Sequence, residues 1–216
     1  MPQIFTRTLT AQDAMQSGPT VNACVGFELP CEGEHGKNQC VNDEPLMAFV
    51  ALGANLGDAA GTLRLAAAEL VGWSSARVLG SSLWRTKPVA CPPGSPPFLN
   101  AVLGLQPEPG VTPESLLDDL LALEIRLGRI RSSLVNAPRE IDLDLIVFGD
   151  ETRVTPTLTL PHSRAHERAF VLAPLAEIAP DLILPGQKTP VVGLLAMLGQ
   201  AEEVVKIEPL MNGNER

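Results

Sequence analysis

The sequence predicts an α+β fold, a ferredoxin-like βαββαβ sandwich with extra C-terminal helices that complete three layers in the order α/β/α. Two observations favour this class. Between residues 47 and 148, apolar residues follow strand and helix periods in the order strand, helix, strand, strand, helix, strand. Two further helical segments follow the last of these strands.

The first half of the expected domain contains three strands and one helix. An apolar run at 48–52 predicts a strand ending in a glycine-containing turn, and Asp58 is a suitable N-cap for the first helix. Residues 74–85 are expected to form the second strand, and the alternating residues 98–105 the third. Between them, residues 86–97 include five prolines and one glycine, which predicts a loop.

The second half adds one strand and three helices. Thr112 is a suitable N-cap for the second helix, and Gly128 is expected to end it. Residues 140–148 give the strongest strand signal in the sequence. Residues 164–178 predict a helix that a proline interrupts, and residues 191–198 a short helix that closes the domain.

Three segments differ in character. Residues 1–46 hold three of the four cysteines and show no sustained period, so they are expected to be a disordered extension, unless Met47 is the true start. A small zinc module with His35 is an alternative, although the ligand spacing fits it poorly. Residues 47–200 form the expected domain, and residues 201–216 a polar tail.

Composition limits the possible partners. The chain of 216 residues carries a formal net charge of −9, which argues against binding to nucleic acid or to an anionic membrane. No apolar run approaches the roughly 20 residues of a membrane span. The N-terminus lacks a secretory signal, so we expect a cytoplasmic protein, as a monomer or weak dimer.

Two aspartates on the last strand are the sharpest chemical feature. Side chains alternate along a strand, so Asp142 and Asp144 point to the same side. Neighbouring carboxylates repel each other, and a divalent cation between them removes that cost. Ligation by oxygen atoms alone suits magnesium, with water and substrate phosphates as further ligands. The alternative is a solvated strand face that carries two acids.

Arginines cluster just upstream of the aspartates. Arg129 and Arg131 follow the second helix, and Arg139 leads into the strand. Guanidinium groups bind phosphate oxygens through paired hydrogen bonds, so beside a magnesium pair they suggest a polyphosphate substrate. Glu124 could accept a hydrogen bond from a nucleotide hydroxyl or pair with an arginine. The alternative is a set of surface arginines paired with Glu124 and Glu140.

A second cluster lies within residues 161–170. His162 and His166 are four apart, as in helical metal pairs, but no third ligand follows them. Arg164 and Arg168 have the same spacing. For His162 and Arg168, a binding role and a solvated helix face both remain open.

Together, five segments resemble the 6-hydroxymethyl-7,8-dihydropterin pyrophosphokinase family of folate biosynthesis. They are FVALGANLGD (49–58), WRTKPVACPPGSPPFLNAV (84–102), LEIRLGRIR (123–131), NAPREIDLDLIVFG (136–149) and LPHSRAHERAFVLAPLAEIAPDLILPG (160–186). The resemblance implies an ATP-dependent enzyme that transfers the β,γ-diphosphate of ATP to the pterin hydroxymethyl group. The products would be AMP and the pterin diphosphate.

The resemblance also implies roles for individual residues. Asp142 and Asp144 would hold two Mg²⁺ ions and, with Arg129 and Arg139, form the catalytic set. The nucleotide would contact Glu124, Arg129, Arg131, Arg139, Thr159 and His162. The pterin pocket would be formed by Thr86, Pro88, Val89, Phe98, Asn100, Arg168 and Phe170.

Aromatic content agrees with this pterin pocket. The chain has no tyrosine and only 4% aromatic residues, so few side chains can stack on a flat heterocycle. Phe98 and Phe170 would stack on the two faces of the pterin, with Asn100 between them. The sequence departs from the pattern of some family members at Lys87, Leu121, Asn136, Thr157 and Ser163.

Two alternatives to this reaction remain open on the sequence alone. One is a nucleotidyl or phosphoryl transferase of the same fold that acts on another acceptor. The other is a ferredoxin-like binding module without activity. A binding module gives no reason for two adjacent like charges on one strand face, so Asp142 and Asp144 favour an enzyme.

Overall fold

The computed structural model describes residues 45–130, 137–199 and 203–211. Most of the segment 1–46, including the cysteines and His35 of the alternative zinc module, lies outside the described residues. Arg131 and Asn136 lie outside them too. The elements are β1 (Ala48–Ala54), α1 (Ala59–Val71), β2 (Leu79–Gly80), β3 (Ser82–Thr86), β4 (Phe98–Leu105), α2 (Pro113–Arg126), β5 (Asp142–Phe148), β6 (Arg153–Val154), β7 (Thr159–Leu160), a 3₁₀ turn (Ala165–Glu167), α3 (Ala169–Ile178), α4 (Val191–Leu198) and β8 (Val204–Pro209).

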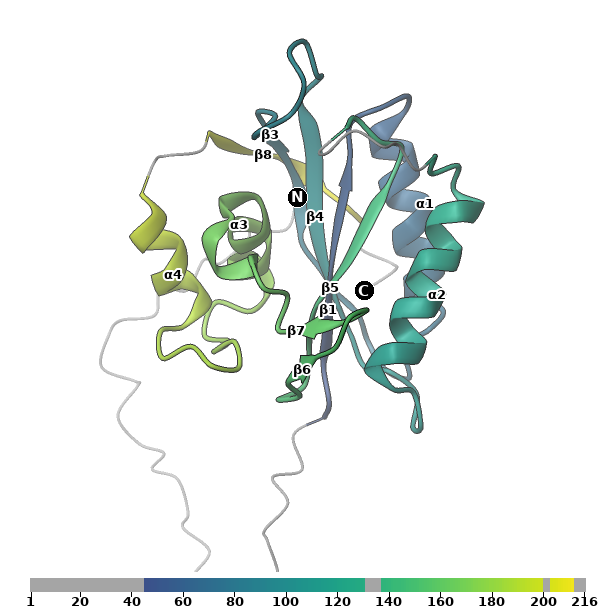
Figure 1. Cartoon of the computed structure of the whole chain (residues 1–216), viewed down its shortest axis with the longest axis vertical. Coiled ribbons are helices and arrows are strands. Elements are labelled where there is room, and N and C mark those ends of the chain that lie inside the picture. The colour runs from purple at the N-terminus through teal and green to yellow at the C-terminus, as the bar shows by residue number, and fades with distance from the viewer. Residues whose placement is uncertain (1–44, 131–136, 200–202, 212–216) are drawn as a thin grey trace, which may run out of the picture. The chain divides into compact units, whose positions relative to one another are not determined.

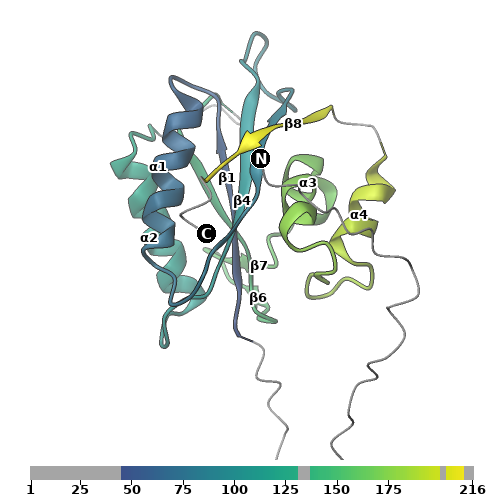
Figure 2. The ribbon, with the colours of Figure 1, turned by 180° about the vertical axis from the view of Figure 1, so that it is seen from behind.

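The main sheet has the predicted ferredoxin-like order. Its strands follow one another as β5, β1, β4, β3 and β8, and the short β2 pairs with β4. Each of these pairings is antiparallel, and each of α1 and α2 connects two strands that have another strand between them. Figure 1 shows α1 and α2 on one side of the sheet and α3 and α4 on the other, and the reverse view in Figure 2 agrees. The three-layer prediction is confirmed.

The first helical layer begins where the capping residues predict. The Asp58 carboxylate accepts the Gly61 N–H at 3.0 Å and so satisfies one free donor at the start of α1. Thr112 and Ser115 cap α2 reciprocally. The apolar faces of both helices are buried against the sheet, at Leu63, Ala66, Ala67 and Leu70 of α1 and at Leu116, Leu120 and Leu123 of α2.

The second helical layer differs in one detail from the prediction. The interruption expected at Pro174 is wrong, because Pro174 lies inside α3. The break falls instead at Arg168, whose extended backbone separates the 3₁₀ turn from α3. A proline removes one intrahelical hydrogen bond, and the burial of Val171, Leu172 and Leu175 offsets that loss.

The strand expected at residues 74–85 is shorter and divided. Regular pairing covers only β2 and β3, and Ser81 separates them. The buried Ser81 hydroxyl accepts the Val102 N–H at 2.9 Å, while the Ser81 N–H donates to the Val102 carbonyl at 3.0 Å. A side-chain oxygen therefore replaces a backbone acceptor of the ladder, which interrupts the strand.

The polar tail expected at residues 201–216 is wrong for Val204–Pro209. This segment is strand β8, paired antiparallel with β3. Its charged side chains have partners on helices: Lys206 pairs with Glu177 of α3 at 3.0 Å, and Glu208 pairs with Arg64 of α1 at 2.5 Å. The polarity of the segment thus reflects an edge strand between the two helical layers.

The sheet face toward α3 changes character along the strands. At one end it is apolar and packs in the core beneath α3 and α4, with Phe49, Val102 and Ile146 buried. At the other end the same face carries Gly53, Asn100 and Asp142, which line a cavity. In the described part of the chain, no helix is long and apolar enough to cross a membrane.

Candidate active site

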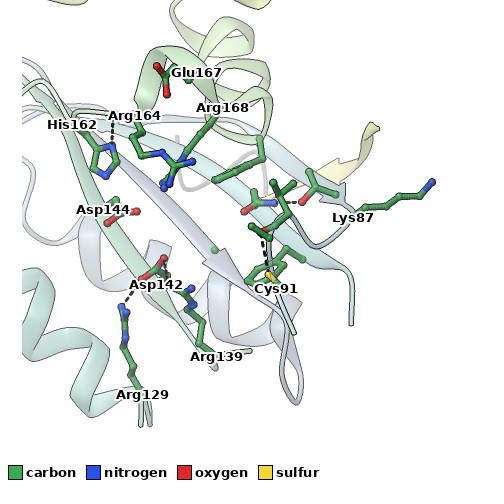
Figure 3. A pocket seen from close by; sticks show the side chains of 17 residues that line it. Lys87, Cys91, Arg129, Arg139, Asp142, Asp144, His162, Arg164, Glu167 and Arg168 are labelled. Atoms are coloured by element: carbon green, nitrogen blue, oxygen red, sulfur yellow. Dashed lines mark hydrogen bonds and ion pairs between the residues drawn. The ribbon is translucent and has the colours of Figure 1, made fainter. Parts of the chain in front are cut away.

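A cavity of about 370 Å³ lies at the polar end of the sheet. Its floor is a row of three residues in register on neighbouring strands, because Gly53 of β1 pairs with Asp142 of β5 and with Asn100 of β4. The other residues come from strands β3, β4 and β5, from the connecting segments, from the 3₁₀ turn and from the start of α3 (Figure 3). The predicted site residues that line the cavity are Thr86, Val89, Phe98, Asn100, Arg129, Arg139, Asp142, Asp144, His162, Arg168 and Phe170.

Three other predicted site residues do not line this cavity. Glu124 is buried beside it, Thr159 is exposed on β7, and Pro88 lies in the proline-rich loop. Arg131 is outside the described residues. Most of the predicted residues, although distant in the sequence, therefore lie together at one end of the sheet.

Asp142 is held by two arginines. Arg129 Nη1 lies 2.6 Å from Asp142 Oδ1, and Arg139 Nη1 lies 2.8 Å from Asp142 Oδ2. Burial alone would lower the pKa of Arg129, but the charges of Asp142 and Glu124 outweigh it and raise that pKa. Arg129 is therefore charged at pH 7.

Glu124 connects helix α2 to strand β5. Its side chain is almost fully buried, and its carboxylate accepts the Leu143 N–H at 2.7 Å and pairs with Arg129. Burial raises the pKa of Glu124, and these two contacts oppose that rise. The geometry places Glu124 behind Arg129, so the carboxylate orients the arginine that holds Asp142.

Asp144 is different from Asp142. No described residue forms a hydrogen bond or ion pair with its carboxylate. Burial, followed by the charge of Asp142, raises the pKa of Asp144. A cation would relieve the cost of this unpaired carboxylate, so the donor pair fits a hard divalent metal such as Mg²⁺.

His162 lies beside the aspartates on a fixed backbone. The backbone N–H of His162 donates to the Ile146 carbonyl of β5 at 2.9 Å. Its imidazole Nδ1 accepts the backbone N–H of Arg164 at 3.3 Å. Burial lowers the pKa of His162, although Asp144 opposes this. The imidazole is therefore neutral at pH 7, with Nε2–H as its donor.

Two phenylalanines add aromatic surface to the cavity. Phe98 and Phe170 both line it, and the Arg168 guanidinium lies 5.4 Å from the centre of the Phe170 ring. Asn100 also lines the cavity and is buried, and its Nδ2 donates to Thr86 Oγ1 at 2.9 Å. This bond fixes the amide and leaves its Oδ1 as an acceptor.

The family model described as 7,8-dihydro-6-hydroxymethylpterin-pyrophosphokinase (HPPK) matches residues 49–180. This range contains every residue that lines the cavity. The chain belongs to the HPPK family.

Named relatives agree with this family, and a solved structure shares the fold. The chain is 40% identical over 141 residues to the 2-amino-4-hydroxy-6-hydroxymethyldihydropteridine pyrophosphokinase of Methylorubrum extorquens, covering 65% of this chain and 87% of that protein. It is 36% identical over 144 residues to the Haemophilus influenzae protein of the same name, covering 66% and 88%. A Plasmodium falciparum HPPK-DHPS structure shares the fold with a TM-score of 0.57 at 13% identity, over 75% of this chain and 49% of that one.

Several cavity residues of this HPPK-family chain were not predicted as site residues. They are Gly53, Lys87, Ala90, Cys91, Arg164 and Glu167. Strand alternation could have found Gly53, since Asp142 and Gly53 meet across β1 and β5. The spacing of Arg164 and Arg168 was a second signal. Lys87, Ala90 and Cys91 lie on irregular backbone and Glu167 ends the short 3₁₀ turn, so no strand or helix periodicity reveals their direction.

Proposed function

We propose that this HPPK-family chain transfers the β,γ-diphosphate of ATP to the hydroxymethyl group of 6-hydroxymethyl-7,8-dihydropterin in folate biosynthesis. The pterin oxygen attacks the β-phosphorus and loses its proton, the bond from that phosphorus to the α-phosphate oxygen breaks, and AMP leaves. The observation that supports this reaction is one cavity that combines Asp142 and Asp144, four arginines and two phenylalanines.

The chain's own residues supply position and charge. Phe98 and Phe170 stack on the pterin, and the fixed Asn100 amide accepts from a ring N–H. Arg129 and Arg139 neutralise phosphate oxygens as negative charge shifts toward AMP. No protein nucleophile is required, because holding the hydroxyl in line with the phosphorus is the main contribution.

Asp142 and Asp144 are the residues that would hold magnesium, and we propose two ions. Among the described residues, no group of three or more His, Cys, Asp and Glu side chains is arranged to hold a metal ion, so water and phosphate oxygens would complete the ligands. Bound there, Mg²⁺ neutralises the phosphate charge of ATP. His162, Arg131 and Thr159 are proposed to contact the nucleotide, and Glu124 to act through Arg129.

The decisive experiment measures which nucleotide is released. The protein is incubated with ATP, Mg²⁺ and 6-hydroxymethyl-7,8-dihydropterin, and the nucleotides are separated by ion-exchange chromatography. Diphosphate transfer produces AMP and pterin diphosphate in equal amounts. Release of ADP, or of AMP in the absence of the pterin at the same rate, would contradict the proposal.

We also propose that the protein acts in the cytoplasm as a monomer or weak dimer. The net charge of −9 supports small-molecule substrates rather than nucleic acid or a membrane surface. Sedimentation analysis over a range of concentrations tests the oligomeric state, and cell fractionation tests the compartment.

A further inference from the structure

A second pair of arginines faces the cavity from the segment between β7 and α3. Arg164 and Arg168 stand at the two ends of the 3₁₀ turn Ala165–Glu167 and both line the cavity. In the view of Figure 3, Asp142 and Asp144 lie between this pair and the pair formed by Arg129 and Arg139. The two aspartates are thus bordered by guanidinium groups on two sides.

The two pairs differ in how their charge is compensated. Arg129 and Arg139 pair with Asp142, as described above. Within the described residues, neither Arg164 nor Arg168 forms an ion pair with a carboxylate, and the adjacent Glu167 is directed to His166 at 3.6 Å. Burial, and then the charge of Arg164, lower the pKa of Arg168, although the charges of Asp144 and Asp142 oppose this. Two close positive charges that lack an ion-pair partner favour the binding of an anion.

The backbone fixes Arg164 before any ligand arrives. Its N–H donates to His162 Nδ1 at 3.3 Å, its carbonyl accepts the Glu167 N–H at 3.2 Å, and the next residue, Ala165, is fully buried. The His162 N–H is in turn bonded to Ile146 of β5, the strand that carries Asp144. The backbone of Arg164 is therefore held in place relative to β5, while its side chain is exposed at the cavity.

We infer that Arg164 binds, together with Arg168, the diphosphate group that is transferred, on the pterin side of the two aspartates. This inference rests on the proposed function. Arg168 lies over Phe170, which is proposed to stack on the pterin, so a phosphate attached to the pterin hydroxymethyl group lies next to these two arginines. A guanidinium group binds two phosphate oxygens at once, which suits a group that changes partners during the reaction.

Calorimetric titration of an Arg164→Gln variant tests this role. The ligands are pterin diphosphate, α,β-methylene-ATP, AMP and hydroxymethylpterin, each with Mg²⁺. We expect roughly 10- to 100-fold weaker binding of pterin diphosphate and α,β-methylene-ATP, as one lost charge-assisted contact predicts. Binding of AMP and hydroxymethylpterin should change by less than about twofold. Arg164→Lys keeps the charge without the paired donors, so its affinities should be intermediate.

Arg126→Gln is the matched control, because Arg126 pairs with Glu69 on the outer surface of α1 and α2 and does not line the cavity. Unchanged binding of pterin diphosphate to the Arg164→Gln variant would overturn the inference. An equal loss for all four ligands would overturn it too, since it would indicate a structural role. If the unmodified protein binds pterin diphosphate but forms no AMP, the proposed reaction fails while the binding comparison still reports on Arg164.

Discussion

The two aspartates of β5 occupy different environments although they are only two residues apart. Asp142 has two arginine partners, whereas no described residue pairs with Asp144. Position along the strand explains this contrast, because Asp142 is the first residue of β5, where Arg129 and Arg139 from the connection between α2 and β5 reach it. Asp144 lies two residues further along the strand, opposite Ala51, and lines the cavity.

An Asp144→Asn substitution should therefore separate activity from stability. Turnover should fall roughly a hundredfold or more, because a metal ligand is lost. The melting temperature of the metal-free protein should stay the same or rise, because the substitution removes repulsion between two like charges. Steady-state AMP release and calorimetry measure the two effects.

Asp150→Asn is the control for this substitution, since Asp150 lies in the exposed turn directly after β5. It should leave both AMP release and melting temperature unchanged. A near-normal turnover of the Asp144→Asn variant would contradict the metal assignment.

At the scale of elements, Glu177 joins α3 to the edge of the sheet. Its carboxylate accepts the Ser82 N–H at 3.0 Å, the Ser82 hydroxyl at 2.8 Å and the Trp84 Nε1–H at 3.0 Å, and it pairs with Lys206 of β8. Burial alone would raise the pKa of Glu177, but the hydrogen bonds outweigh it and lower that pKa. Three elements therefore depend on one charged carboxylate.

The lowered pKa of Glu177 predicts a pH-dependent contribution to stability. The charged carboxylate stabilises the fold above the unfolded-state pKa of about 4.3, and this contribution is lost as the pH falls through the lower pKa of the folded state. A Glu177→Gln substitution should cost about 1–3 kcal/mol of unfolding free energy at pH 7. The difference from the unmodified protein should shrink at about pH 3.

Urea unfolding of both proteins at the two pH values measures this difference. Glu208→Gln is a suitable control, because Glu208 forms a single exposed ion pair with Arg64 and should contribute less than about 1 kcal/mol. Equal costs of Glu177→Gln at both pH values would show that the charge of Glu177 is not what stabilises the contact.

Local signals explain which elements were predictable. The Asp58 and Thr112 caps and the helix at residues 191–198 depend on nearby residues alone, and all three agree with the structure. The division at Ser81 depends on a hydroxyl that meets Val102 from another strand, and β8 depends on partners in β3. Such contacts between distant segments leave no periodicity in the sequence.

The same difference between local signals and contacts of distant segments applies to the candidate site. Asp142 and Asp144 could be placed on one face of their strand by alternation, whereas the resemblance to the family indicated Asn100. The sequence indicated Arg164 only through its four-residue spacing from Arg168. The direction of its side chain depends on the 3₁₀ turn and on the break at Arg168. The position of Glu124 behind Arg129 required the packing of α2 on β5, which no local pattern contains.

At the scale of the whole molecule, the described domain closes its own core. Met47 accepts the Gly149 N–H at 2.8 Å just before β1, and the described members of both apolar clusters all come from Met47 onward. Deleting residues 1–44 should therefore change the unfolding free energy by less than about 0.5 kcal/mol and leave AMP release unchanged. Thermal unfolding and the AMP assay check this, and a clear loss in either would show that the deleted segment contributes.

Strand β8 lies beyond the segment that defines the family, which ends at residue 180. A recombinant fragment cut at that limit would lack α4 and β8 and would leave the backbone donors and acceptors of β3 without their partners on that side. An uncovered strand edge recruits strands from other molecules. Expression boundaries for crystallisation or inhibitor screening should therefore extend past Met211, the last described residue of the buried core.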